Sequence, residues 1–209
     1  MTQARTIGDL LADATTVLRD SGSASPRLDA ELLLGHVLRI DRAGLIAGHE
    51  LSVGAEAAAH FRAALERRMR GEPVAYIRGI KEFYGLAFSV DTRALIPRPD
   101  TERLVELALD RLRRALVERP RPQGSPALRA WDIGTGSGAI AVSVAAECRR
   151  RGYSAEVRVL ATDAEPAALA LATENAVGHG VADMVTLRRA DLAELDGATA
   201  AEWLPVDLV

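Results

Sequence analysis

The heptapeptide Asp132-Ile-Gly-Thr-Gly-Ser-Gly138 decides the fold of this chain. It closes a short apolar run, Leu128 to Ile133, with the length of a buried strand, and it opens a helical pattern from about Gly138 to Arg150. Its three glycines let the backbone turn tightly and let a ligand approach without a Cβ in the way. The following helix presents N–H groups at its amino terminus. The heptapeptide is therefore predicted to be the ligand-binding turn of a strand–turn–helix unit.

The residues after this turn continue to alternate between strand and helix patterns. Strands are predicted at Val157 to Thr162 and Met184 to Arg188, with a helix from Glu165 to Val177 between them. Val206-Asp-Leu-Val209 has the composition of one more strand. This alternation predicts an α/β fold of the Rossmann-like type, with an incomplete parallel sheet and a ligand site at the carboxyl ends of its strands.

The first third of the chain has a helical period. Apolar residues recur every three or four positions from Ile7 to Leu18, and Ser25-Pro26 opens a second such stretch. Shorter and longer helices are predicted at Arg42 to Ala47 and at Ala55 to Arg70. Because these apolar stripes contain no polar clusters, we expect residues 1–73 to be a small helical bundle that serves packing or recognition.

Between Val74 and Val90 the pattern changes to aromatic and β-branched residues interrupted by glycines, which favours a β-hairpin. Residues 74–96 are predicted to be a hairpin linker, and residues 97–209 the sheet domain. The stretch Leu95-Ile-Pro-Arg-Pro-Asp-Thr-Glu102 is stiffened by two prolines on either side of Arg98. Taken alone, this stretch fits the wall of a binding site as well as a rigid linker.

Composition narrows the classes of function. The 26 basic and 29 acidic residues are interspersed along the chain and give a net charge of −3. This pattern indicates no basic surface that could hold a phosphate backbone, so direct nucleic-acid binding is not expected. Cys148 is the lone cysteine, and neither a disulfide nor a metal site is expected. No apolar run is long enough to cross a membrane. A cytoplasmic protein is the expectation.

The glycine turn by itself does not identify its ligand, because Gly134-x-Gly136-x-x-Ala139 also satisfies a dinucleotide fingerprint. The acids around it favour S-adenosylmethionine. Asp132 directly precedes the turn, where a carboxylate can anchor amides of the turn or, through water, the ammonium of S-adenosylmethionine, and would repel a pyrophosphate. Asp163 ends the second strand, in position to accept ribose hydroxyls, although NAD enzymes also place an acid there. Asp191 follows the third strand, where it can accept from an adenine amino group while Leu192 covers the ring. Asp163 and Asp191 also fit a purely structural role as helix caps or turn residues.

At this point the chain resembles a known family, the peptide chain release factor glutamine methyltransferases, also called HemK or PrmC. The resemblance runs nearly end to end and is specific in combination. It is carried by Ser25-Pro-Arg-Leu-Asp-Ala-Glu-Leu-Leu-Leu34, Gly71-Glu-Pro-Val-Ala-Tyr76, Glu82-Phe83, Ile96-Pro-Arg-Pro-Asp-Thr-Glu102 and the heptapeptide itself. It implies methylation of the side-chain amide of the glutamine in the Gly-Gly-Gln motif of release factors, with S-adenosylmethionine as donor.

The resemblance also implies roles for individual residues. Gly134, Thr135, Gly136, Ser137 and Gly138 would line the methionine end of the cofactor, Asp163 the ribose, and Asp191 and Leu192 the adenine. Leu95 and Arg98 would lie near the mouth where the glutamine enters. The helical bundle would help to dock the release factor, and the full-length form is expected to be a monomer.

In the family, the strand matching Val206 to Val209 continues into Asn-Pro-Pro-Tyr, which orients the amide, and this sequence does not contain that motif. No residue of the chain is therefore given a catalytic role, and we expect the isolated chain to be inactive and prone to aggregate. Three other functions compete with this prediction: a cofactor-binding or docking protein without chemistry, an amino-group methyltransferase acting on nucleic acid, and, more distantly, an NAD-linked oxidoreductase.

Overall fold

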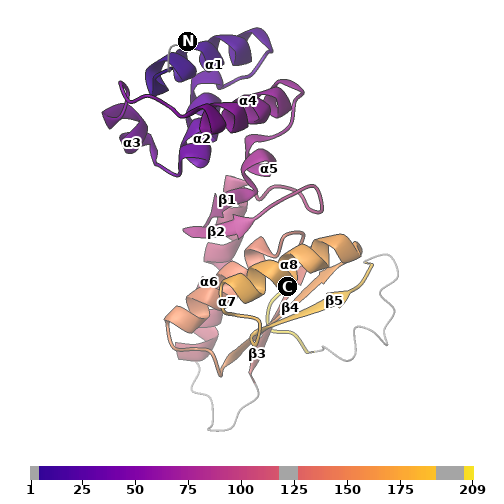
Figure 1. Ribbon diagram of the computed structural model, residues 1–209. Coiled ribbons are helices and arrows are strands. Elements are labelled where there is room, and N and C mark those ends of the chain that lie inside the picture. The colour runs from indigo at the N-terminus through magenta and orange to yellow at the C-terminus, as the bar shows by residue number, and fades with distance from the viewer. Residues whose placement is uncertain (1–4, 118–126, 192–204) are drawn as a thin grey trace. The chain divides into compact units, whose positions relative to one another are not determined.

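The computed structural model describes residues 5–117, 127–191 and 205–209 (Figure 1). The chain divides into two compact units, Met1–Gly79 and Ile80–Val209.

The first unit is helical, as predicted. Its helices are α1 (Ile7–Asp20), α2 (Pro26–Leu38), α3 (Arg42–Ala47), α4 (Ala55–Met69) and α5 (Val74–Arg78). Helix α1 begins with a capping box, in which Thr6 and Asp9 each accept the other's backbone N–H. Apolar side chains of all five helices form one core, centred on residues such as Leu11, Leu33 and Phe61.

A buried carboxylate connects two of these helices. Asp29 on α2 accepts hydrogen bonds from the hydroxyls of Ser23 and Ser25, at 2.7 and 3.0 Å, and from Arg68 Nε on α4 at 2.8 Å. Since its partners satisfy it, this charge has a structural explanation within the bundle.

The hairpin prediction was wrong over Val74 to Arg78, which form α5. Gly79 ends this helix in the left-handed conformation that its lack of a Cβ permits. A short apolar run with an aromatic residue fits either element, and here a helical turn packing on α2 and α4 prevailed. The hairpin itself begins one residue later, with β1 (Ile80–Phe83) and β2 (Leu86–Ser89) paired antiparallel. Tyr84 and Gly85 form its turn, both at positive φ.

The second unit continues with the 3-10 turn η1 (Pro99–Thr101) and helix α6 (Glu102–Val117). The predicted alternation follows as β3 (Leu128–Ile133), α7 (Ala139–Arg150), β4 (Val157–Asp163), α8 (Pro166–Gly178) and β5 (Val185–Arg189). The three strands form a parallel sheet in the order β3-β4-β5, which confirms the predicted fold class.

Two further observations complete the sheet. Val157, Val159, Leu160 and Ala161 of β4 are all fully buried, as expected for a middle strand covered on both faces. On the free side of β3, the segment at Leu208 lies parallel to the strand, and the Trp131 N–H donates to the Leu208 carbonyl at 2.8 Å. The residues predicted as a last strand therefore pair with β3, through a single bridge.

Candidate functional site

The carboxyl ends of the three strands meet at one edge of the sheet. Ile133 is in register with Thr162, and Asp163 is in register with Arg189. The Gly134 and Thr135 N–H groups both donate to the Thr162 carbonyl, at 2.8 and 2.9 Å, and the Ala190 N–H donates to the Asp163 carbonyl at 3.1 Å. The glycine turn, Asp163 and the residue before Asp191 are thus neighbours, as the sequence predicts.

The three glycines of the turn all have positive φ: 73° at Gly134, 55° at Gly136 and 79° at Gly138. Their surroundings differ. A Cβ at Gly134 would meet nothing within 4 Å, and one at Gly136 would meet only the Ala94 Cβ at 3.9 Å. A Cβ at Gly138 would lie 3.0 Å from the Ala172 Cβ of α8. The first two glycines therefore leave the backbone open to a ligand, whereas the third allows α7 to begin against α8.

Asp132, the last but one residue of β3, anchors the glycine turn through its side chain. Its Oδ2 accepts the Thr135 hydroxyl at 2.7 Å and the Ala141 N–H at 3.2 Å. Because Gly138 has no side chain to cap α7, this carboxylate supplies the cap from a neighbouring strand. Burial raises the pKa of the Asp132 carboxyl, and the nearby Asp163 charge acts in the same direction, while the two hydrogen bonds oppose the rise.

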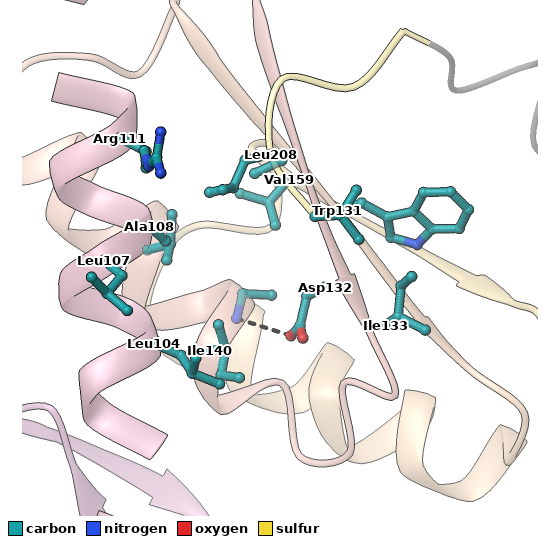
Figure 2. A pocket seen from close by; sticks show the side chains of 14 residues that line it. Leu104, Leu107, Ala108, Arg111, Trp131, Asp132, Ile133, Ile140, Val159 and Leu208 are labelled. Atoms are coloured by element: carbon teal, nitrogen blue, oxygen red, sulfur yellow. Dashed lines mark hydrogen bonds between the residues drawn. The ribbon is translucent and has the colours of Figure 1, made fainter. Parts of the chain in front are cut away.

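Asp132 lines a cavity of about 450 Å³ whose other walls are mainly apolar, including Leu104 and Leu107 of α6, Ile140 of α7 and Leu208 (Figure 2). Figure 2 shows the carboxylate turned toward the α7 backbone, with the hydrogen bond from Ala141 as a dashed line. Apolar walls on one side and donors on the other place the charge at the boundary between the turn and the cavity.

Replacing Asp132 with asparagine is expected to stabilise the chain at neutral pH, because burial disfavours the ionised carboxylate and raises its pKa. The raised pKa of Asp132 means that its stabilising contribution is complete below the unfolded pKa and is lost as pH rises through the folded pKa. Asparagine keeps an acceptor for Thr135 and Ala141 but never ionises. Urea denaturation at several pH values checks this. The gain should grow as pH rises from the unfolded pKa, about 4, through the folded pKa, and Asp20→Asn, at an exposed position, should show none.

Asp163, at the end of β4, touches the turn directly. Its Oδ2 accepts the Gly136 N–H at 2.8 Å, and its Oδ1 accepts the Glu165 N–H at 3.0 Å. Each carboxylate oxygen has a second lone pair, so these bonds leave capacity for hydroxyl donors. The side chain is partly exposed at the edge of the sheet. Asp163 can therefore anchor the glycine turn and hold a ligand at the same time.

The remaining predicted residues lie at different depths. The side chains of Thr135 and Ser137 are buried in the turn, whereas Asp191 is exposed after β5. Leu192 lies outside the described residues. Leu95, 71% exposed, and the exposed Arg98 lie between β2 and η1. Because Ala94 is the neighbour of Gly136, this segment starts beside the glycine turn.

One residue that the sequence reasoning missed joins the turn to the hairpin. Asn175 of α8 is 3% exposed, and its side chain binds the backbone of both Ser89 and Ser137. Its signal in the sequence is a polar residue at helical spacing from Leu171 and Ala172, on the face that packs inward.

Among residues 5–117, 127–191 and 205–209 no group of three or more histidine, cysteine or acidic side chains is arranged to hold a metal ion. In the same described ranges, none of the helices combines the length and the apolar character that a membrane span requires.

Comparison with known proteins shows which proteins this chain is similar to. Residues 9–79 match the model of the PrmC N-terminal domain. The chain is 39% identical over 201 residues to the release factor glutamine methyltransferase of Chlorobaculum tepidum, covering 96% of this chain and 64% of that protein. Identity to the enzyme of the same name is 42% over 193 residues in Moorella thermoacetica, covering 92% and 62%, and 43% over 171 residues in Vibrio cholerae, covering 82% and 54%.

Solved structures show weaker likeness. An S-adenosylmethionine-dependent methyltransferase from Geobacter sulfurreducens, in complex with S-adenosylhomocysteine, is 24% identical with a TM-score of 0.30, over 43% of this chain and 29% of that one. An O-methyltransferase from Bacillus cereus is 23% identical with a TM-score of 0.28, over 48% and 47%.

The chain spans less than two thirds of the length of the curated relatives named above. Residues 9–79 match the PrmC N-terminal domain model, and over nearly its whole length the chain is similar to the release factor glutamine methyltransferases.

Proposed function

We propose that the second unit binds S-adenosylmethionine at the carboxyl edge of β3, β4 and β5. The turn Gly134–Gly138 takes the methionine end, Asp163 the ribose, and Asp191 with Leu192 the adenine. The observation that carries the proposal is the pair of carboxylates flanking an open glycine turn: Asp132 below it and Asp163 bonded to its middle N–H. An ammonium and two hydroxyls suit these carboxylates, whereas the pyrophosphate of a dinucleotide would meet negative charge.

The proposed reaction is transfer of a methyl group to the side-chain amide nitrogen of a glutamine in a release factor, within its Gly-Gly-Gln motif. Bound S-adenosylmethionine would supply the electrophilic methyl group. The amide is a poor nucleophile because its lone pair is delocalised into the carbonyl, so the protein has to orient it. Leu95 and Arg98 are proposed to line the entry of the glutamine, since their segment begins at Ala94 beside Gly136. The names of the relatives support this substrate.

The division of labour follows the predicted domains. Residues 1–73 are proposed to dock the release factor and 97–209 to hold the cofactor. Of the predicted linker, only residues 80–96 are proposed to link, because Val74–Arg78 pack in the first unit as α5. We further propose a monomeric, cytoplasmic full-length protein that acts without contacting nucleic acid, in line with the net charge of −3.

We also infer that residues 1–209 by themselves bind the cofactor without methylating glutamine. The Asn-Pro-Pro-Tyr motif, which in the family orients the amide, is not in this sequence. Orienting donors and acceptors of this kind are each worth about 3 kcal/mol or more of barrier lowering.

Isothermal titration of the 209-residue chain with S-adenosylhomocysteine tests the proposal. Binding is expected, and NADH at the same concentrations should give none. Gly134→Ala is the matched variant, because it adds a methyl group where the turn is open, at a conformational cost of about 1–2 kcal/mol for φ 73°. We expect it to fold and to lose the binding. Absence of binding by the parent chain, or binding of NADH instead, would overturn the cofactor assignment.

Incubation with S-adenosylmethionine carrying a labelled methyl group separates the functions that remain. No label should enter a release factor or a nucleic acid with this chain. Label in the release factor would contradict the proposed inactivity while supporting the substrate, and label in nucleic acid would establish the competing amino-group methyltransferase. A pull-down with release factor then distinguishes docking from its absence.

A further inference from the structure

Asn175 is a polar side chain at a position where α8 packs inward. It is 3% exposed, and Leu171, Ala172 and Ala176 around it on the helix are fully buried. A buried amide in such surroundings is costly unless its hydrogen bonds are made. The partners of this amide therefore indicate why it is tolerated.

Its partners are backbone atoms of two distant segments. Oδ1 accepts the Ser89 N–H at 2.8 Å, and Nδ2 donates to the Ser89 carbonyl at 3.0 Å, so the amide pairs with the last residue of β2 as a neighbouring strand would. The second Nδ2 hydrogen is donated to the Ser137 carbonyl in the glycine turn, at 2.9 Å. Ser89 and Ser137 are thus held by one side chain.

The residue before Asn175 anchors the chain that follows β2. Glu174 accepts two hydrogen bonds from the Arg93 guanidinium, at 2.6 and 2.8 Å, and Arg93 also pairs with Asp91. Arg93 lowers the pKa of the Glu174 carboxyl, as expected for a paired acid. The segment 89–93 is therefore attached to α8 at both ends, and it leads through Ala94, the neighbour of Gly136, to Leu95 and Arg98.

We propose that Asn175 is a positioning residue that fixes the glycine turn and the 89–98 segment relative to each other. A ligand bound at the turn then also slows opening of the backbone in the segment. The proposal rests on the proposed function, which places the cofactor at the turn and the substrate glutamine beside Leu95 and Arg98. Glu174 is the outer, solvent-exposed part of the same connection.

The amide chemistry makes the position demanding. Only a side chain with one acceptor and two donors can bond a backbone N–H and two carbonyls together, and among residues of this size that is asparagine. Aspartate would set a carboxylate oxygen against the two carbonyls, and alanine would leave three backbone groups without their partner.

Amide hydrogen exchange on the ligand-free chain is the first test. In Asn175→Ala, exchange in residues 89–98 and in the turn is expected to quicken roughly tenfold to a hundredfold, the equivalent of one lost buried hydrogen bond. Thr173→Ala, a neighbouring exposed position on α8, is the matched control and should leave both segments unchanged. If Asn175→Ala leaves the two segments as slow as in the parent, the positioning role is refuted.

The second test adds S-adenosylhomocysteine. In the parent and in Thr173→Ala, binding should slow exchange in both the turn and the 89–98 segment. In Asn175→Ala the turn should still be protected at saturating ligand, whereas the 89–98 segment should not respond. A purely structural role would instead weaken both responses equally, and would contradict the proposal.

Two further results keep the outcomes separate. If Asn175→Ala does not fold, Glu174→Gln replaces it, at a side chain that is 54% exposed. This variant should quicken exchange at 91–98 and leave exchange in the turn unchanged. Unchanged exchange at 91–98 refutes the connection. If the parent binds no S-adenosylhomocysteine, the proposed function fails, and the ligand-free comparison still decides whether Asn175 holds the two segments together.

Discussion

Replacing Gly138 with alanine is expected to lower the free energy of unfolding of the second unit by about 2 to 5 kcal/mol. Two independent costs add. The residue has φ 79°, which costs an alanine about 1–2 kcal/mol. Its new Cβ would also lie 3.0 Å from the Ala172 Cβ and 3.2 Å from the Ala172 Cα, and such overpacking costs about 1–3 kcal/mol. Because the second contact is with helix backbone, side-chain rotation does not relieve it.

Gly152→Ala is the control for this prediction. Gly152 follows α7 at φ 83°, so it carries the same conformational cost, but a Cβ there would meet nothing within 4 Å. Urea denaturation of both variants, followed by circular dichroism, isolates the packing cost as their difference. Equal losses at the two positions would show that α7 and α8 can move apart, and that Gly138 is required only for its backbone conformation.

The strands and helices of the second unit were predictable because each pattern was long and bounded. Val157 to Asp163 is mainly apolar and ends at an acid. Gly134, Gly136 and Gly138 lie between β3 and α7, and all three have the positive φ that favours glycine. The carboxyl ends of parallel strands then meet at one edge by topology alone. The proximity of Asp132, Asp163 and the turn followed from these rules.

The segment from Val74 shows where such rules stop. Five residues, Val74–Arg78, contain two β-branched residues and an aromatic one, yet they form a helical turn. A run this short has no period of its own, so its contacts decide its conformation. The connection through Asn175 was missed for a related reason. Ser89 lies 86 residues away from it in sequence, and nothing local indicates that pairing.

Sequence also left open what each acid does. Asp163 could be read as a turn residue or as a ribose ligand, and the structure gives it the first role without removing the second: it bonds the N–H groups of Gly136 and Glu165 and remains partly exposed. Asp132 was expected to anchor the turn or attract an ammonium, and its bonds to Thr135 and Ala141 establish the anchoring.

Replacing Asp163 with alanine is expected to weaken S-adenosylhomocysteine binding roughly a hundredfold, because a charge-assisted hydrogen bond contributes about 1.5–3 kcal/mol. Glu165→Ala, two residues on and exposed, is the control and should bind as the parent does. This loss of affinity has two candidate causes. One is the missing contact with the ribose, and the other is the missing hydrogen bond from the Gly136 N–H, which the Asp163 carboxylate accepts at 2.8 Å.

An analogue of S-adenosylhomocysteine without ribose hydroxyls separates these two sources by titration calorimetry. If Asp163 binds the ribose, the parent should bind the analogue weakly and the alanine variant should bind it almost as well as the parent does, because the lost contact is the same in both. If Asp163 acts only through Gly136, the variant should lose the same factor with either ligand. Asp163→Asn, which keeps an acceptor for the Gly136 N–H, should then recover most of the affinity in the second case and little in the first. A penalty that is independent of the ligand would remove Asp163 from the proposed ribose site and leave it as an anchor of the turn.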